Sequence, residues 1–187
     1  TQWPRRTYFR IKKTIQMIKS FNTYLFRKKG NVWDIAIYVP QTEAEPFINN
    51  GNKRVICTIN TTFSFHAGLM PLDNGDSFIT INSEIHKKLK LEVDDTLLIS
   101  LEKDDSPYGT PLPKELQTAW ELDPEGQDVF HTLTKGKQRS LIYQIGKPKS
   151  SEIRIQKALT VLEYLKSVNG NLNFKELNEA HKLANKK

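Results

Sequence analysis

Residues 53–101 read KRVICTINTTFSFHAGLMPLDNGDSFITINSEIHKKLKLEVDDTLLISL, and this stretch decides the fold. Residues 54–60 alternate between two faces and are rich in β-branched side chains, which is typical of a strand with one buried face. Asn74 and Gly75 lie between two apolar runs and predict a tight hairpin turn, because both residue types tolerate a positive φ. A short helix, capped by Asn82 or Ser83, is expected over residues 83–90, and a further strand over residues 96–101.

Two more strands are expected upstream of this stretch, over residues 20–27 and 33–39. Together with the later segments they make about six short strands, which favours a small, closed or partly open antiparallel β-barrel. Such barrels are filled by side chains, and the aromatic residues expected to line this one are Trp33, Phe63, Phe65 and Phe78.

Acidic residues, proline and glycine gather in residues 104–113, and the apolar period changes there from 2 to 3.6. Five helical segments are expected after this boundary, the longest beginning at Ser150 or Ser151 and ending near Val168. Its buried stripe is expected to contain Ile155, Ala158, Leu159, Leu162 and Leu165. The sequence therefore predicts an α+β protein with a barrel domain over residues 17–105 and a helical region over residues 111–187.

The formal net charge of +7 is unevenly distributed. Residues 1–16 contribute +5, residues 17–109 contribute −2 and residues 110–187 contribute +4. The basic leader precedes Met17, which looks like a natural start, so we expect residues 1–16 to be disordered or foreign to the native chain. The alternative is a genuine basic tail that binds nucleic acid or membrane.

The remaining composition limits the location of the protein and the chemistry open to it. The single cysteine, Cys57, excludes an internal disulfide framework and fits a reducing compartment. No apolar run approaches the length of a membrane span, and no signal peptide is visible, so a cytoplasmic protein is expected. His66, His86, His131 and His181 have no metal-ligand spacing, and no catalytic or cofactor motif is present. We therefore expect no metal, no cofactor and a non-enzymatic role.

Two resemblances bear on the fold. The segment ITINSEIHKKLKLEVDDTLLISL resembles the half-barrel of AbrB-type swapped-hairpin proteins, which often bind DNA. The second resemblance has two parts. The segments WDIAIYVP, GNKRVICTIN, LMPLDNGDSFITIN and LEVDDTLLISLEKD resemble a bacterial domain family of unknown function. The segments LPKELQTAWELDPEGQDVFHTL and PKSSEIRIQKALTVLEYLKSVNG resemble the YdeI/OmpD-associated, or bacteriocin-protection, family. This second resemblance implies a bacterial protein with a barrel, a helical tail and no established enzymatic activity. One departure is Ile153, because the family usually has threonine before the arginine of the long helix.

The candidate binding site is a basic cluster in the helical region. Seven cations are opposed only by Glu152 within 23 residues: Lys135, Lys137, Arg139, Lys147, Lys149, Arg154 and Lys157. Lysine and arginine supply most non-specific affinity for nucleic acid, and Tyr143 could stack on a base. An anionic ligand or nucleic acid is therefore the expected partner.

Three alternatives stay open. The basic cluster could be an ordinary solvated helix face. The protein could instead be an AbrB-like DNA-binding regulator with Lys87 and Lys88 on phosphates. The third alternative is a small-molecule binder or enzyme with a pocket at the barrel–helix junction, holding His66 or Arg154. The sequence leaves the oligomeric state undetermined.

Overall fold

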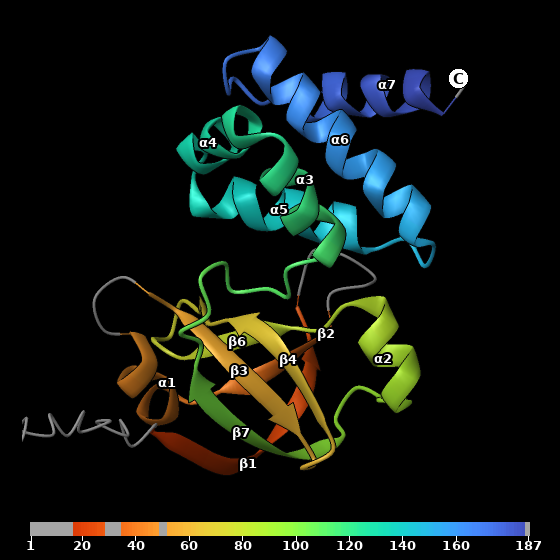
Figure 1. Cartoon of the computed structure of the whole chain (residues 1–187). Helices are drawn as coiled ribbons and strands as arrows, with labels where there is room; N and C mark the ends of the chain where they lie inside the picture. The colour runs from red at the N-terminus through yellow and green to blue at the C-terminus, as the bar shows by residue number, and fades with distance from the viewer. Residues whose placement is uncertain (1–16, 29–34, 49–51, 186–187) are drawn as a thin grey trace, which may run out of the picture. The chain divides into compact units, whose positions relative to one another are not determined.

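A computed structural model of the chain describes residues 17–28, 35–48 and 52–185. The chain divides into two compact units, Thr1–Asp104 and Asp105–Lys187, and each is described by itself. The first is built around an antiparallel sheet and the second from helices, so the predicted α+β class is confirmed (Figure 1). The basic leader and Trp33 lie outside the described residues.

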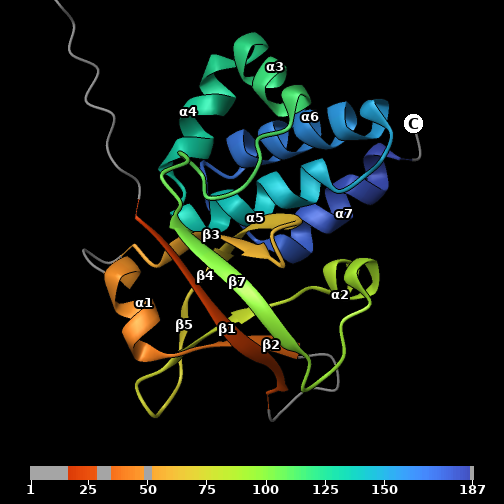
Figure 2. The same ribbon diagram turned by 90° about the horizontal axis from the view of Figure 1, so that it is seen from below.

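The described part of the barrel unit contains seven strands in a single sheet with the order β4-β3-β7-β1-β2-β6-β5. Every neighbouring pair is antiparallel. Helices α1 and α2 lie on opposite sides of this unit in both views (Figures 1 and 2). The strands are β1 (Ile18–Arg27), β2 (Ile35–Val39), β3 (Arg54–Ile59), β4 (Phe63–Gly68), β5 (Met70–Pro71), β6 (Ser77–Thr80) and β7 (Thr96–Lys103), and the helices are α1 (Gln41–Ile48) and α2 (Ser83–Leu89).

The two edges of the sheet come from one continuous run of chain. Strands β4 and β5 stand at opposite ends of the strand order, yet only Leu69 separates them in sequence. Leu69 is buried, and its backbone N–H donates to the carbonyl of Lys53 at 2.8 Å. The run therefore pairs first with β3 and then with β6, which closes the sheet on itself. Counted as one bent strand, β4 and β5 bring the total to the six strands that the sequence predicts.

The barrel interior is formed by the alternate side chains of these strands. Val55, Cys57 and Ile59 of β3 are fully or almost fully buried, as the alternation predicts. Burial also raises the pKa of the Cys57 thiol to about 12, so the thiol is protonated at neutral pH. Phe63 and Phe65 pack against this core.

Phe78 corrects one expectation, because it does not line the interior. It pairs with Tyr38 across β2 and β6, and its ring meets the ring of Phe26 edge-on with 6.4 Å between centroids. The next residue, Ile79, joins the core instead. Successive residues of a strand point to opposite faces, so Ile79 faces the core and Phe78 faces the other side of the sheet. There Phe26 and Lys28 cover its ring, and Phe78 is only 4% exposed.

Helix α2 begins and ends with recognisable caps. The Asn82 side chain accepts a hydrogen bond from the backbone N–H of Ile85 at 2.8 Å. Lys90 ends the helix with φ of 51° and ψ of 42°, a left-handed conformation that glycine usually occupies. Placing a side chain there costs on the order of 1 kcal/mol.

The helical unit has a hydrophobic core of its own. Helix α6 is its central element and contacts each of the other four helices (Figure 1). Among the described residues, none of the helices has the length and apolar composition that a membrane span requires. The five helices are α3 (Lys114–Leu122), α4 (Pro124–Thr132), α5 (Lys135–Gly146), α6 (Ser151–Ser167) and α7 (Phe174–Ala184).

The buried face of α6 is rotated from the expected stripe. Ala158, Leu162 and Leu165 are buried as predicted, but Ile155 is 45% exposed and Leu159 is 48% exposed. Val161 and Tyr164 are buried in their place. The reason is that α7 packs beside α6, where the Tyr164 hydroxyl donates to Glu176 at 3.0 Å. The buried arc therefore turns toward α7 and leaves Ile155 and Leu159 at the surface.

Two glycines of the helical unit test this packing. A Cβ on Gly126 would lie 2.6 Å from Asp123 Oδ2 and 3.0 Å from the Cβ of Leu162. We expect Gly126→Ala to lower the free energy of unfolding by about 1–3 kcal/mol, the usual cost of overpacking. Gly136→Ala is the matched control, because nothing lies within 4 Å of its added Cβ. It should leave stability unchanged or raise it by up to about 1 kcal/mol, since alanine is the better helix former. Denaturant unfolding measures both, and an equal loss in the two variants would contradict the packing.

Candidate functional site

Helix α5 carries the first part of the basic cluster, and its inner face is firmly anchored. Gln138 is buried, and its Nε2 donates to the carbonyls of Leu133 at 2.9 Å and His131 at 3.2 Å. Its amide is thus paired with the end of α4, as a buried polar group requires. Leu141 and Ile145 continue the same buried face. The opposite face of α5 is consequently left to solvent.

Beside that buried face, four residues recur at intervals of four: Lys135 and Tyr143, which are exposed, Arg139, which is half-buried, and Lys147, which is exposed at the C-cap after α5. We call these residues the α5 stripe. Because a helix rises 1.5 Å per residue, successive members are separated by roughly 6 Å along the axis. Tyr143 is 50% exposed and lies between two cations. Within the described part of the chain, none of the ion pairs involves Arg139 or Lys147.

The other lysines of the cluster, Lys137 and Lys149, lie close to Lys135 and Lys147 in sequence and extend this basic surface. Lys135 Nζ lies 5.7 Å from the centroid of the Tyr108 ring and 3.5 Å from Gln138 Oε1, so its ammonium group is held near the start of α5. Lys137 is half-buried beside the stripe, and Lys149 is exposed in the loop that follows α5.

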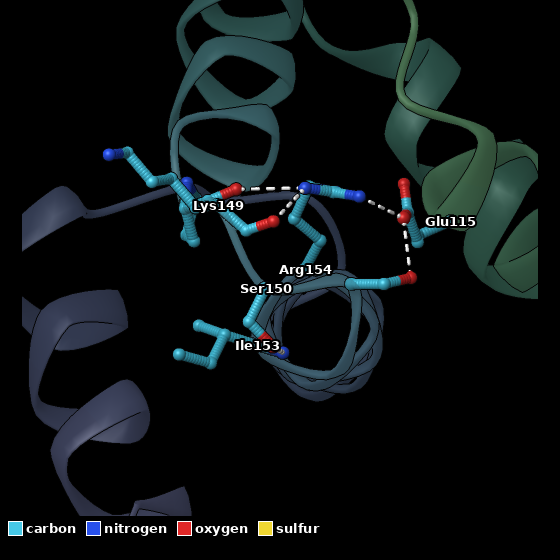
Figure 3. Close-up of polar contacts among 7 residues, drawn as sticks. Glu115, Lys149, Ser150, Ile153 and Arg154 are labelled. Atoms are coloured by element: carbon cyan, nitrogen blue, oxygen red, sulfur yellow. Dashed lines mark hydrogen bonds and ion pairs between the residues drawn. The ribbon is translucent and has the colours of Figure 1, made fainter.

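Arg154 has a different role from the other cations of the cluster. Its Nη1 donates to the carbonyls of Pro148 at 2.9 Å and Lys149 at 2.8 Å, and its Nη2 donates to Glu115 Oε1 at 2.6 Å. Figure 3 shows the guanidinium extending between the loop carbonyls and Glu115. Arg154 therefore joins α6, the loop before it and the start of α3, and its donors are used within the fold.

The surroundings of Glu115 reinforce this junction. Besides Arg154, the Ser151 hydroxyl donates to Glu115 Oε1 at 2.7 Å. These two hydrogen bonds, with that of Arg154 the stronger influence, lower the pKa of Glu115 to about 2. Ile153, where the family usually has threonine, is largely exposed and points away from this contact (Figure 3).

Lys157 faces a third direction. Together with burial, which is the larger cause, its charge lowers the pKa of His181 on α7. Of the seven predicted residues, the structure thus places Lys135, Arg139 and Lys147 on the α5 stripe and Lys137 and Lys149 beside it, with Arg154 and Lys157 engaged elsewhere on α6.

The other histidines and lysines singled out in the sequence have identifiable neighbours. His66 lies on β4 with Nδ1 2.8 Å from a carboxylate oxygen of Asp104, which is buried. His131 accepts or donates a hydrogen bond at 2.8 Å with the Tyr108 hydroxyl. Lys88 Nζ lies 4.7 Å from the centroid of the Phe63 ring. Within the described ranges, no three residues of the types His, Cys, Asp and Glu gather closely enough to hold a metal ion.

Among the described residues, each of the two units contains a pocket that no motif in the sequence indicates. One, of about 690 Å³, belongs to the barrel unit and includes His86 and Lys87 in its wall. The other, of about 440 Å³, lies between α6 and α7 beside Tyr164. Neither contains His66 or Arg154. Their walls combine residues distant in sequence, which no spacing rule connects.

Comparisons with known proteins support the stated resemblance. Residues 21–101 match the model of a domain of unknown function, DUF1905. Residues 110–167 match the model of the family described as bacteriocin-protection, YdeI or OmpD-associated. The two parts of the chain are therefore similar to a DUF1905 domain and to the YdeI/OmpD-associated family, as the sequence motifs predict. Searches of the curated proteins and of the solved structures returned no match.

The Arg154–Glu115 contact gives the helical unit a defined response to acid. Because the folded state lowers the pKa of Glu115 from 4.5 to about 2, the ionised carboxylate stabilises the fold above pH 4.5. This stabilisation is lost as the pH falls from 4.5 toward 2, where the folded state also takes up the proton. We expect Glu115→Gln to lower the unfolding temperature at pH 6 and to have a smaller effect at pH 2.

Thermal unfolding followed by circular dichroism across this pH range measures the effect. Glu121→Gln is a matched control, since Glu121 lies on the same helix, is exposed and shares no ion pair among the described residues. An unfolding difference between wild type and Glu115→Gln that stays constant from pH 6 to pH 2 would contradict the role given to the ionised carboxylate.

Proposed function

We propose that this protein is a non-enzymatic binding protein that holds an anionic partner on the α5 stripe. The single observation that carries the proposal is the arrangement of three cations and a tyrosine at four-residue intervals along α5 and its C-cap. Residues 135–149 contain five basic residues and no acidic one. A local excess of positive charge of this kind attracts anions and speeds their association.

The backbone that carries the α5 stripe is held in place at both ends, which supports a binding role in addition to the charge. The inner face of α5 is fixed by Gln138, and the Thr134 side chain caps the start of the helix at Lys137 N, 3.4 Å away. At the other end, Arg154 holds the carbonyls of Pro148 and Lys149. The backbone that carries the cations is therefore ordered before a partner arrives, which reduces the entropic cost of binding.

Tyr143 favours nucleic acid among the possible anionic partners. A half-exposed aromatic ring between two cations provides a stacking surface and phosphate contacts in one row. Single-stranded nucleic acid uses this combination, since its unpaired bases can stack on a ring while its backbone follows positive charge.

We further propose that binding takes place in the cytoplasm of a bacterial cell. The protonated, buried Cys57 thiol and the lack of other cysteines support a reducing compartment. The YdeI/OmpD-associated match supports the bacterial assignment.

Fluorescence anisotropy with a labelled single-stranded oligonucleotide tests the proposal. Because residues 1–16 are strongly basic, all variants should be prepared with Arg5, Arg6, Arg10, Lys12 and Lys13 changed to serine. We expect Arg139→Gln with Lys147→Gln to weaken binding and to flatten the slope of log K against log salt by about 1.4, or about 0.7 for each lost phosphate contact. Tyr143→Ala should cost about 1–3 kcal/mol of binding free energy with little change in slope.

The matched control is Lys114→Gln with Lys175→Gln, which removes the same charge from exposed positions on α3 and α7. If the control weakens binding as much as the stripe variant, only the overall charge matters and the site is wrong. If the leader-neutralised protein does not bind at any salt concentration while the unaltered chain does, residues 1–16 are responsible for binding. That result would contradict the proposal that the helical unit binds an anionic partner.

A further inference from the structure

The barrel unit contains a second basic feature, which is concave and independent of the α5 stripe. It is the pocket of about 690 Å³ between α2, the loop after it, the end of β1 and the start of β2. Pockets that bind small ligands have volumes of roughly 300–1,000 Å³ and combine apolar walls with a few polar groups. This pocket has both components.

Its apolar lining comes from four aliphatic residues: Ile35, Ile81, Leu91 and Val93. Ile81 and Leu91 are buried parts of the barrel core, so the floor of the pocket is held by packing. An exposed surface of this composition favours contact with the hydrocarbon or ring portion of a ligand.

Its rim is predominantly basic. Among the described lining residues, Arg27, His86, Lys87 and Lys90 are basic and Glu92 is acidic. Among the described lining residues, the exposed lysines Lys87 and Lys90 favour an anionic head group. Glu92 lies on the same wall as Lys90, so it limits the charge of the ligand that the rim accepts.

The positions of two adjacent lysines separate this pocket from the rest of the α2 surface. Lys87 lines the pocket, whereas the ammonium group of Lys88 lies over the Phe63 ring, 4.7 Å from its centroid. The two residues have equal charge and neighbouring positions on one helix. They therefore form a natural pair for testing whether a bound anion occupies the pocket.

Lys90 provides a second observation at the same rim. It occupies the left-handed position that ends α2, with φ of 51°, where glycine would be less strained. Its backbone N–H is bonded to the carbonyls of His86 and Lys87, so the strained position is part of the pocket wall. Strain of this kind is concentrated at functional sites, where the side chain contributes something that a better backbone fit would not.

We propose that this pocket binds a small amphipathic anion, with a carboxylate or phosphate head at Lys87 and Lys90 and an apolar body against Ile35, Ile81, Leu91 and Val93. Neither the family matches nor the α5 stripe assigns such a ligand. The apolar floor distinguishes this site from a phosphate track for duplex DNA, which requires cations in a row and leaves no use for a buried aliphatic surface.

The test uses the full chain, with octanoate and octyl phosphate as probes in a titration followed by NMR and calorimetry. Saturable shifts of the backbone amides of His86, Lys87 and Val93 are expected, and the tighter probe identifies the head group. Acetate lacks the apolar body and octanol lacks the charge, so each should bind at least about tenfold more weakly than octanoate.

Three variants locate the binding. Lys87→Glu and Lys90→Gly are each expected to weaken octanoate binding by about tenfold, whereas Lys88→Glu should change it by less than about twofold. Lys90→Gly should also leave the unfolding temperature unchanged or raise it, because glycine suits the left-handed position. Lost binding in a protein at least as stable as wild type excludes unfolding as the cause.

Two results would overturn the proposal. The first is the absence of saturable amide shifts with both octanoate and octyl phosphate in the millimolar range. The second is an equal loss with Lys87→Glu and Lys88→Glu, which would show that the general charge of α2 matters and the pocket does not. If a DNA duplex shifts the same amides and Lys88→Glu weakens that binding equally, α2 is a DNA-binding surface instead.

Discussion

The barrel unit depends on a run of chain, residues 63–71, that pairs with the sheet at both of its edges. An open antiparallel sheet exposes unpaired N–H and carbonyl groups along its two outer strands, and such edges promote association. Here β4 pairs with β3. After the single residue Leu69, β5 pairs with β6. Pro71, the last residue of the run, has no backbone N–H group, so no hydrogen-bond donor is left unpaired there. Closure therefore requires no additional strand.

The same run preserves the inward alternation across the bend. Phe63, Phe65, Ala67 and Leu69 all belong to the core or pack against it, although the pairing partner changes along the way. Their register is fixed by burial, since a shift of one residue would send all four to the solvent side. The position of α2, and of the pocket beside it, follows from a barrel that is closed and packed.

Local patterns predicted the parts of this structure that depend on local physics. The alternation of Val55, Cys57 and Ile59 follows from the period of a strand, and the cap at Asn82 follows from side-chain chemistry within three residues. The orientation of α6 could not be predicted as well, because Ile155 and Leu159 have the apolar character of buried residues. Only the packing of α7 beside α6 shows why Tyr164 is buried in preference to them.

Sequence patterns likewise predict some parts of the candidate sites and not others. The charge of Arg154 is visible in the sequence, but its partner Glu115 is 39 residues away and no spacing rule joins them. The α5 stripe could be anticipated from residues four apart. The barrel pocket could not, because Arg27 and Lys87 come from separate elements and meet only through the sheet. The basic residues of the helical unit thus have two roles. Arg154 makes contacts within the fold, whereas the α5 stripe is available to a partner.

That division has an evolutionary consequence for the loop between α5 and α6. Arg154 recognises the backbone carbonyls of Pro148 and Lys149 and makes no use of the lysine side chain for this contact. Hydrogen bonds to the backbone are insensitive to the identity of the residue that supplies them. A change of charge at position 149 therefore leaves the path of the loop intact, whereas loss of either Glu115 or Arg154 removes the ion pair between α3 and α6. Relatives of this chain can acquire different surface specificities on an unchanged helical scaffold.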